Sequence, residues 1–270
     1  MIVIIKKPLL LILCIALLFC GCSRQTESVQ SNAVYETLDN KTQGWGFRRT
    51  QNGPEFSENQ IRQMTEYDCL YKETAEEKNI FLTFDEGYEN GYTSIILDKL
   101  REKDVKAAFF VTGDYVKSNP DLIKRMIEEG HIVGNHTVNH PSLPNIKSTD
   151  ELLSELRELD RLICNLGGKK CNYLRPPRGE YSERTLAITR DNGYTNVFWS
   201  QAYVDWNNDV DKSTAFTKVT SDLHSGCVLL LHAVCKGNAE ALGDIIDYAR
   251  KEGYSFKSLD EYTKLKAFSK

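Results

Sequence analysis

From Asn79 onward the chain alternates short apolar runs with longer amphipathic stretches, and this alternation limits the possible folds more than any other feature. Strands that alternate with helices form parallel sheets, because each crossover helix returns the chain to the same end of the sheet. About seven such units close into a barrel rather than a small open sheet. We therefore predict an α/β fold, a (β/α) barrel that forms a single domain with an N-terminal extension.

The expected strands are short and apolar, and they lie at residues 80–84, 107–111, 132–133, 173–174, 197–199, 228–231 and 255–256. The expected helices lie between them, at residues 92–102, 120–129, 149–166, 182–192, 213–223, 239–252 and 259–267. Several of these helices end at a glycine, which is a common helix stop. An additional helix is expected at 57–70, before the barrel begins.

Acidic and imidazole side chains follow three of the expected strands. Asp85 and Glu86 follow the first, His136 and His140 follow the third, and His232 ends the sixth. The carboxyl ends of barrel strands meet at one face, so these side chains are expected to gather there. Neutral imidazole nitrogens and carboxylate oxygens are ligands of divalent metals. The sequence therefore predicts a metal site at this face.

Each of these groups also has an ordinary structural explanation. An Asp-Glu pair after a strand is commonly a solvated turn, and two histidines four residues apart are commonly unrelated. A histidine that ends an apolar strand is usually a hydrogen-bonded structural residue. The order of the three groups and their common face favour a joint site. His131 and His224 match no such pattern, and we expect both to be structural.

Five sequence motifs occur in the order found in one enzyme family. They are NIFLTFDEG (79–87), HTVNHP (136–141), RPPRG (175–179), DW (205–206) and LLLH (229–232). With these motifs the chain from Asn79 to about Leu265 resembles the polysaccharide deacetylases, the NodB-homology enzymes of carbohydrate esterase family 4. The resemblance implies a distorted (β/α) barrel and a hydrolase that cleaves the acetamide C–N bond of a sugar.

The resemblance assigns catalytic roles to four residues. Asp85 would be the general base, and Arg175 would orient it and hold it ionised. His232 would be the general acid for the leaving amine, and Asp205 would pair with it. Outside the family context, Arg175 could lie on a rigid surface loop and Asp205 could sit in an ordinary turn.

The resemblance also implies a divalent metal cofactor bound by His136 and His140. We expect zinc, and magnesium, manganese or cobalt remain open. The family usually has a second aspartate in the first motif, where this chain has Glu86. Glutamate keeps the oxygen ligand but adds a methylene, so Glu86 is an uncertain third ligand.

Substrate contacts follow from the same motifs. Trp206 and Leu230 would line the acetyl pocket, and the backbone N–H of Arg178 would help to stabilise the oxyanion. We predict that the Arg178 guanidinium binds the lactyl carboxylate of muramic acid, which a guanidinium matches bidentately. The alternative is an arginine held in a surface salt bridge.

Further short sequence stretches narrow the resemblance to one branch of the family. The stretches GWG (44–46), GYENGYT (87–93) and FWS (198–200), together with Arg178, resemble the sporulation deacetylases. That branch acts on N-acetylmuramic acid of peptidoglycan and leads to muramic δ-lactam in the spore cortex. The alternatives are a deacetylase of N-acetylglucosamine or chitooligosaccharides, an ester deacetylase, or a catalytically weak wall-binding protein.

The N-terminus has the features of an export signal. Lys6 and Lys7 precede an uncharged apolar run at 8–20, which has the length of a signal-peptide core. The following FCGC resembles a bacterial lipobox, with Cys22 as the lipidated residue. We predict a signal peptide at 1–21, a tether at 22–34, an extension at 35–78 that packs on the barrel, and the deacetylase domain at 79–270.

These features predict an extracytoplasmic protein that is lipid-anchored to the cell membrane, held by a signal-anchor, or secreted. The resemblance to the sporulation branch implies a spore-forming bacterium. The formal net charge of −4 argues against a broad nucleic-acid interface, which needs a basic face. We therefore expect peptidoglycan glycan strands as the partner, no nucleic acid, and a monomer. The eight cysteines show no Cys-x-x-Cys pair beyond the leader, so a zinc–cysteine site is not expected, and a Cys164–Cys171 disulfide stays open.

Overall fold

The structure is a computed structural model, and it describes residues 34–51, 53–74, 77–206 and 210–262. The chain divides into two compact units, Met1–Leu38 and Asp39–Lys270. In the described end of the first unit, the Thr37 hydroxyl donates to the Val34 carbonyl at 2.7 Å. The expected signal peptide, Cys22 and the end of the expected helix at 259–267 lie outside the described residues.

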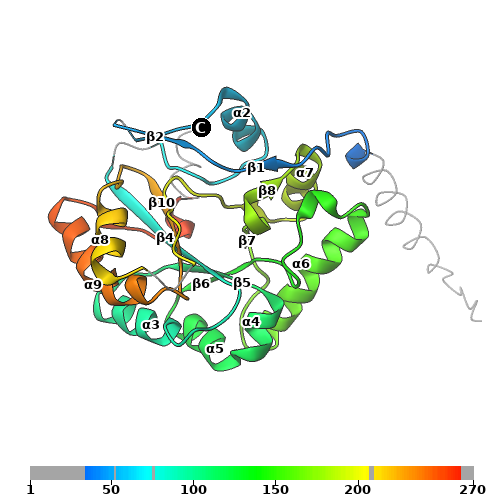
Figure 1. The fold of residues 1–270 in the computed structure, drawn as a ribbon. Helices are drawn as coiled ribbons and strands as arrows, with labels where there is room; N and C mark the ends of the chain where they lie inside the picture. The colour runs from blue at the N-terminus through cyan, green and yellow to red at the C-terminus, as the bar shows by residue number, and fades with distance from the viewer. Residues whose placement is uncertain (1–33, 52, 75–76, 207–209, 263–270) are drawn as a thin grey trace, which may run out of the picture. The chain divides into compact units, whose positions relative to one another are not determined.

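A curled parallel sheet forms the centre of the second unit (Figure 1). Its spatial order is β10 (Cys227–His232), β4 (Asn79–Glu86), β5 (Ala108–Val111), β6 (Ile132–Asn135), β7 (Tyr173–Leu174) and β9 (Thr195–Asn196). The short β11 (Ser255–Phe256) pairs with the start of β4. Past β9, Gln201 forms a parallel bridge with Leu229 of β10, so the chain curls back toward β10 at the other end of the strand order. The predicted α/β barrel-like fold is confirmed.

Helices cover the outside of this sheet, as Figure 1 shows for α3, α4, α5, α6, α8 and α9. The helices are α3 (Thr93–Glu102), α4 (Gly113–Ser118), α5 (Pro120–Glu128), α6 (Thr149–Cys164), α7 (Glu183–Asp191), α8 (Lys212–Thr220) and α9 (Lys236–Lys251). Helix α4 was not expected from the sequence, because six residues are too few to show a helical period. No helix within the described ranges is long and apolar enough to cross a membrane.

One expected strand lies two residues away from its predicted place. The strand predicted at 197–199 is β9 at Thr195–Asn196. Beyond it, Val197 donates its backbone N–H to the Leu174 carbonyl at 2.8 Å and pairs with Leu70. The carbonyls of Val197 and Phe198 accept hydrogen bonds from the Arg175 side chain instead of pairing in the ladder. An apolar run can therefore end a strand early when a buried side chain uses its backbone groups.

Strand β4 is buried along its whole length, as expected for a parallel sheet covered on both sides. Its last two residues are Asp85 and Glu86, and both are buried as well. Burying a carboxyl group is costly unless a partner compensates. The fold therefore places two acids at the carboxyl end of its central strand, where each needs a specific partner.

The segment before the barrel contains β1 (Gln43–Gly44), β2 (Arg48–Thr50), β3 (Gly53–Glu55) and α2 (Glu58–Glu66). Helix α2 ends earlier than predicted, and Asp68 just beyond it has a positive φ of 53°. Trp45 joins this segment to the barrel. Its backbone N–H donates to the Gly179 carbonyl and its indole N–H donates to the Trp199 carbonyl, each at 2.8 Å. The extension therefore contacts the turn that carries the third motif.

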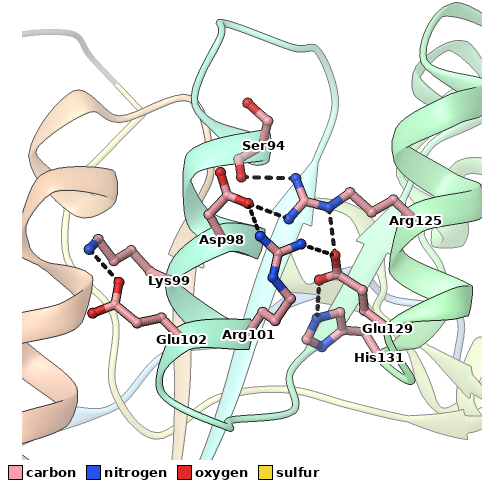
Figure 2. Close-up of polar contacts among 8 residues, drawn as sticks. All are labelled: Ser94, Asp98, Lys99, Arg101, Glu102, Arg125, Glu129 and His131. Carbon is pink, nitrogen blue, oxygen red and sulfur yellow. Dashed lines mark hydrogen bonds and ion pairs between the residues drawn. The ribbon is translucent and has the colours of Figure 1, made fainter.

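An ion-pair network joins α3 to α5 and contacts His131 (Figure 2). Arg101 and Arg125 each pair with both Asp98 and Glu129, at 2.7–3.2 Å. The His131 Nε2 lies 3.8 Å from the Glu129 carboxylate. Burial lowers the pKa of His131 to about 4, so the imidazole is neutral at pH 7. His131 thus has the surroundings of a structural residue.

His224 has a hydrogen-bond partner at each ring nitrogen. Its Nε2 lies 2.9 Å from the Ser200 hydroxyl and its Nδ1 lies 3.0 Å from the Asp222 carbonyl. Cys164 and Cys171 form no disulfide, and neither do the other three cysteines among the described residues. The possible Cys164–Cys171 disulfide is therefore not formed in this structure.

Candidate active site

Asp85 lies at the end of β4, and the Arg175 side chain holds it. The Arg175 Nη1 donates to Asp85 Oδ1 at 2.7 Å, and its Nε donates to the Val197 carbonyl at 3.0 Å. The guanidinium carbon lies 4.3 Å from the centroid of the Phe110 ring, within the range of a cation–π contact. Arg175 is 0% exposed. It is therefore a buried partner of Asp85 and does not lie on a surface loop.

The charge state of Asp85 follows from these contacts. Burial raises the pKa of Asp85, but the charge and hydrogen bond of Arg175, with the charge of His232, outweigh burial, and the net pKa lies below its ordinary value. The carboxyl group is thus ionised at neutral pH. An ionised carboxylate at the carboxyl end of a barrel strand has the form that a general base requires.

His136 and His140 form a pair beside Asp85. Their ring centroids lie 4.8 Å apart. The Nδ1 of His136 lies 2.8 Å from the Arg175 carbonyl, an acceptor, so Nδ1 carries the proton and Nε2 has the free lone pair. Nε2 lies 3.7 Å from Asp85 Oδ2. Burial lowers the pKa of both histidines, to about 4 for His136, so both imidazoles are neutral and each can offer a nitrogen lone pair to a metal.

The loop that carries the two histidines has a strained backbone. Thr137 and His140 have positive φ values of 66° and 54°. The Thr137 hydroxyl accepts from the His140 backbone N–H at 2.9 Å. Between them, Asn139 donates its backbone N–H and its amide to the two oxygens of Glu155 on α6, at 2.9 and 2.6 Å. Tertiary contacts therefore hold this loop in shape, and no motif indicated Glu155.

Glu86 occupies the position where the family usually has a second aspartate. It is fully buried, and neither carboxylate oxygen has a hydrogen-bond partner within the described residues. Burial raises its pKa well above the ordinary value, and the charges of Glu89 and Asp85 raise it further.

The donors at this site fit a divalent metal. Two neutral imidazoles lie together beside an ionised carboxylate. Imidazole nitrogens are borderline ligands and carboxylate oxygens are hard ligands, and zinc and other divalent first-row metals accept both. Across the described part of the chain, no cluster of three or more histidine, cysteine or acidic side chains is already arranged to hold a metal. The protein ligands of the ion would thus be the two imidazoles of His136 and His140, and water or substrate would complete its coordination.

The predicted acid lies at the end of β10. His232 Nδ1 lies 2.7 Å from Asp205 Oδ1, and its backbone N–H donates to Asp205 Oδ2 at 2.8 Å. Burial lowers the pKa of His232, but the hydrogen bond and charge of Asp205, with Asp85, raise it above the ordinary value overall. Asp205 is fully buried, so it is a partner of His232 rather than part of a solvated turn.

Two residues that the sequence did not indicate complete this group. The Asn238 amide, at the start of α9, donates to Asp205 Oδ2 at 2.6 Å and to the His232 carbonyl at 3.1 Å. The Tyr203 hydroxyl donates to the Asn238 side-chain oxygen. The signal that could have revealed Asn238 is an amide on the otherwise apolar face of α9, in line with Leu242.

The three predicted substrate contacts have different surroundings. Trp206 is 56% exposed, and its ring lies edge-on to the His232 ring at 5.7 Å. Leu230 is buried in β10. Arg178 is exposed in a turn with a positive φ of 60°, and its charge lowers the pKa of His140. Trp206 and Arg178 are thus exposed side chains at the edge of the site.

Comparison with known proteins agrees with this geometry. The family model for polysaccharide deacetylases matches residues 72–197. The chain is 44% identical over 255 residues to the peptidoglycan-N-acetylmuramic acid deacetylase PdaA of Bacillus subtilis, covering 93% of each chain. It is 34% identical over 184 residues to a peptidoglycan-N-acetylglucosamine deacetylase of Bacillus cereus, covering 67% of this chain and 66% of that one.

Solved structures show the same fold. The structure of Bacillus subtilis PdaA, a family 4 carbohydrate esterase, matches with a TM-score of 0.82 at 44% identity over 85% of this chain and 100% of that one. A family 4 carbohydrate esterase from Bacillus anthracis matches with a TM-score of 0.72 at 43% identity, over 84% of this chain and 98% of that one. The chain therefore belongs to the polysaccharide deacetylases, the hydrolases of carbohydrate esterase family 4.

Proposed function

We propose that the protein is a metal-dependent peptidoglycan deacetylase that removes the acetyl group from N-acetylmuramic acid, a step toward muramic δ-lactam in spore cortex. The observation that carries this proposal is the arrangement of an ionised base, Asp85, and a paired acid, His232, around two neutral imidazoles. The similarity to a deacetylase named for N-acetylmuramic acid supports the choice of sugar.

A divalent metal held by His136 and His140 would polarise the acetamide carbonyl and lower the pKa of the attacking water. Asp85 accepts a proton from that water through the carboxylate oxygen that faces His136, while Arg175 holds the other oxygen. A buried carboxylate with one oxygen fixed has little freedom to turn away. Its proton acceptance is therefore directed toward one point of the site.

His232 supplies the proton that the leaving nitrogen needs. A bond forms between the water oxygen and the acetyl carbon, the C–N bond breaks, and acetate and the free sugar amine leave. The His232 Nδ1–H is bound to Asp205, so Nε2 is the atom that gives its proton. The raised pKa of His232 keeps the imidazolium populated near neutral pH.

Arg178 supports the choice of muramic acid over glucosamine. Muramic acid carries a lactyl ether, and its carboxylate is free where the peptide has been removed. A guanidinium binds a carboxylate bidentately. Arg178 is exposed and lies close enough to His140 for its charge to lower the pKa of that imidazole.

Mass spectrometry of products tests the proposed function. Peptidoglycan with and without peptide side chains is incubated with the metal-loaded full chain. The sugars are then released and identified by their masses. Deacetylated muramic acid or muramic δ-lactam in the peptide-free material alone supports the proposal. Deacetylated glucosamine, the reaction named for the Bacillus cereus relative, would overturn the choice of sugar. Absence of acetate release would favour a wall-binding protein.

Replacement of Arg178 tests the carboxylate contact. Arg178→Ala should lower kcat/KM on peptide-free muramic acid by about 10- to 100-fold, because a charge-assisted hydrogen bond contributes roughly 1.5–3 kcal/mol. Activity on N-acetylglucosamine, which lacks the carboxylate, should not change. The matched control is Arg161→Ala, because Arg161 is an exposed arginine paired with Glu158 on α6. An equal loss on both sugars would contradict this role.

Replacement of Glu86 tests whether it takes part in metal binding. Its two oxygens are buried without a hydrogen-bond partner in the described residues, and a cation would satisfy them. Glu86→Ala should therefore raise the metal dissociation constant by about tenfold or more, measured by calorimetry. The metal-free variant should be at least as stable as the parent, because an unpaired buried carboxyl is removed. Unchanged metal stoichiometry and activity would remove Glu86 from the site.

We also propose that the protein acts outside the cytoplasm of a spore-forming bacterium, anchored through Cys22. The support is the basic start, the apolar run at 8–20 and the lipobox-like FCGC. The glycan substrate proposed above is likewise found outside the cytoplasm. Fractionation of cells that express the full chain tests this, since lipidation predicts recovery with membranes. Recovery from the cytosol would contradict it.

A further inference from the structure

The Asp205 carboxylate accepts hydrogen bonds at both of its oxygens, and the donors at the two oxygens are different. Its Oδ1 faces the Nδ1 of His232, and its Oδ2 accepts from the His232 backbone N–H and the Asn238 amide. Loss of the Asn238 contact would leave Oδ2 with a single donor, the His232 backbone N–H, and both remaining contacts of Asp205 would then come from His232 itself. The Asn238 contact, at 2.6 Å, is the shorter of the two at Oδ2.

The orientation of the Asn238 amide follows from its partners. A carboxylate and a backbone carbonyl only accept hydrogen bonds, so the NH₂ group must face Asp205 and the His232 carbonyl. The oxygen must then face Tyr203, whose hydroxyl donates to it. Burial raises the pKa of Tyr203, which keeps its hydroxyl protonated and able to donate. The amide thus has one orientation that satisfies every partner.

The start of α9 is fixed against the chain before α8. A Cβ atom at Gly237 would lie 2.5 Å from the Val210 carbonyl oxygen and 2.6 Å from that of Asp211, so only glycine allows this approach. Asn238 is the next residue and is 1% exposed. Its side chain therefore projects toward Asp205 from a backbone that has little room to shift.

We propose that Asn238, fixed by Tyr203, is a positioning residue that sets the orientation of Asp205 and through it the imidazole of His232. The inference rests on the proposed role of His232 as the acid. Asn238 touches neither substrate nor metal and acts only through Asp205. Its loss should slow the step in which His232 gives its proton and leave glycan binding intact.

The experiment separates this role from a general loss of packing. In the metal-free full chain, NMR follows the His232 Nδ1–H, which is bound to a carboxylate and should give a slowly exchanging low-field resonance. The chain has five histidines, and His232→Gln assigns the signal. Asn238→Ala should abolish or broaden this resonance and lower kcat about tenfold or more, with KM within about twofold of the parent, as expected for an interaction made in the transition state.

Two further variants make the outcome decisive. Tyr203→Phe removes one hydroxyl and should give the same changes to a smaller extent. Asn196→Ala removes another buried amide, one that donates to the Thr189 hydroxyl on α7 rather than to Asp205, and should leave the resonance and kcat unchanged. An unchanged resonance and kcat in folded Asn238→Ala would overturn the proposal, as would equal losses in Asn196→Ala. The NMR readout needs no substrate, so an error in the proposed sugar would not affect it.

Discussion

Asp85→Asn should lower the kcat of acetate release by about 10²–10⁴-fold, the usual contribution of a general base. The substitution keeps the shape of the side chain and its hydrogen bond to Arg175 but removes its ability to accept a proton. The structure gives Asp85 the lowered pKa that an ionised base needs, and Arg175 is the main favourable cause. Acetate release from peptide-free peptidoglycan at saturating substrate is the measurement.

The interpretation of this loss depends on the metal, because His136 Nε2 lies 3.7 Å from Asp85. Metal stoichiometry of Asp85→Asn should therefore be measured alongside activity and should remain that of the parent. The matched control is Asp121→Asn, which makes the same exchange at a side chain that is 95% exposed and should have no effect. A loss below about tenfold, with metal retained, would show that another group accepts the proton.

Arg175→Met should destabilise the fold by about 3–5 kcal/mol, because removing one partner of a buried ion pair leaves an uncompensated charge. Arg175 is fully buried and also donates to the backbone carbonyls of Val197 and Phe198. Chemical denaturation at pH 7 measures the loss. Lys169→Met, an exposed cation nearby in the sequence, is the control and should change stability little.

The pH dependence of this loss has a definite sign. In the parent, the folded-state pKa of Asp85 is lowered, so its contribution to stability is present above the ordinary pKa of about 4 and is lost as the pH falls through the folded value. Without Arg175, burial is the main influence and raises the pKa of Asp85. The difference in stability between parent and variant should therefore shrink as the pH falls toward about 4. A difference that is constant with pH would contradict the ion-pair explanation.

The double variant Asp85→Asn/Arg175→Met tests whether the two residues act as one unit. Residues in direct contact are not additive, so the double variant should lose less stability than the two single losses combined. Additive losses would mean that Arg175 stabilises the fold through its carbonyl contacts alone.

Most strand and helix positions were predictable from periodicity, because short apolar runs and amphipathic stretches alternate strongly after Asn79. The six-residue α4 and the shift of β9 were not. The first is too short for a period, and the second depends on Arg175 taking the carbonyls of Val197 and Phe198. Both exceptions arise from contacts that no local pattern encodes.

The site divides in the same way. Motif order pointed to Asp85, His136, His140 and His232, and a parallel barrel brings the carboxyl ends of its strands to one face. Nothing in the motifs revealed Asn238 or Glu155, because each contacts the site's residues across the fold and not through a local pattern. The extension before the barrel gave no chemical signal either, yet Trp45 contacts the turn of the third motif.

The sequence by itself therefore determined the fold class and the family and indicated the residues that we propose carry the chemistry, since these are recorded in periodicity, residue type and order along the chain. Only the tertiary structure decided their states: that Arg175 is a buried partner of Asp85, and that His136 presents Nε2 rather than Nδ1. Ionisation and tautomer depend on burial and on contacting residues that lie far away in the sequence. Arg175, for example, follows Asp85 by 90 positions.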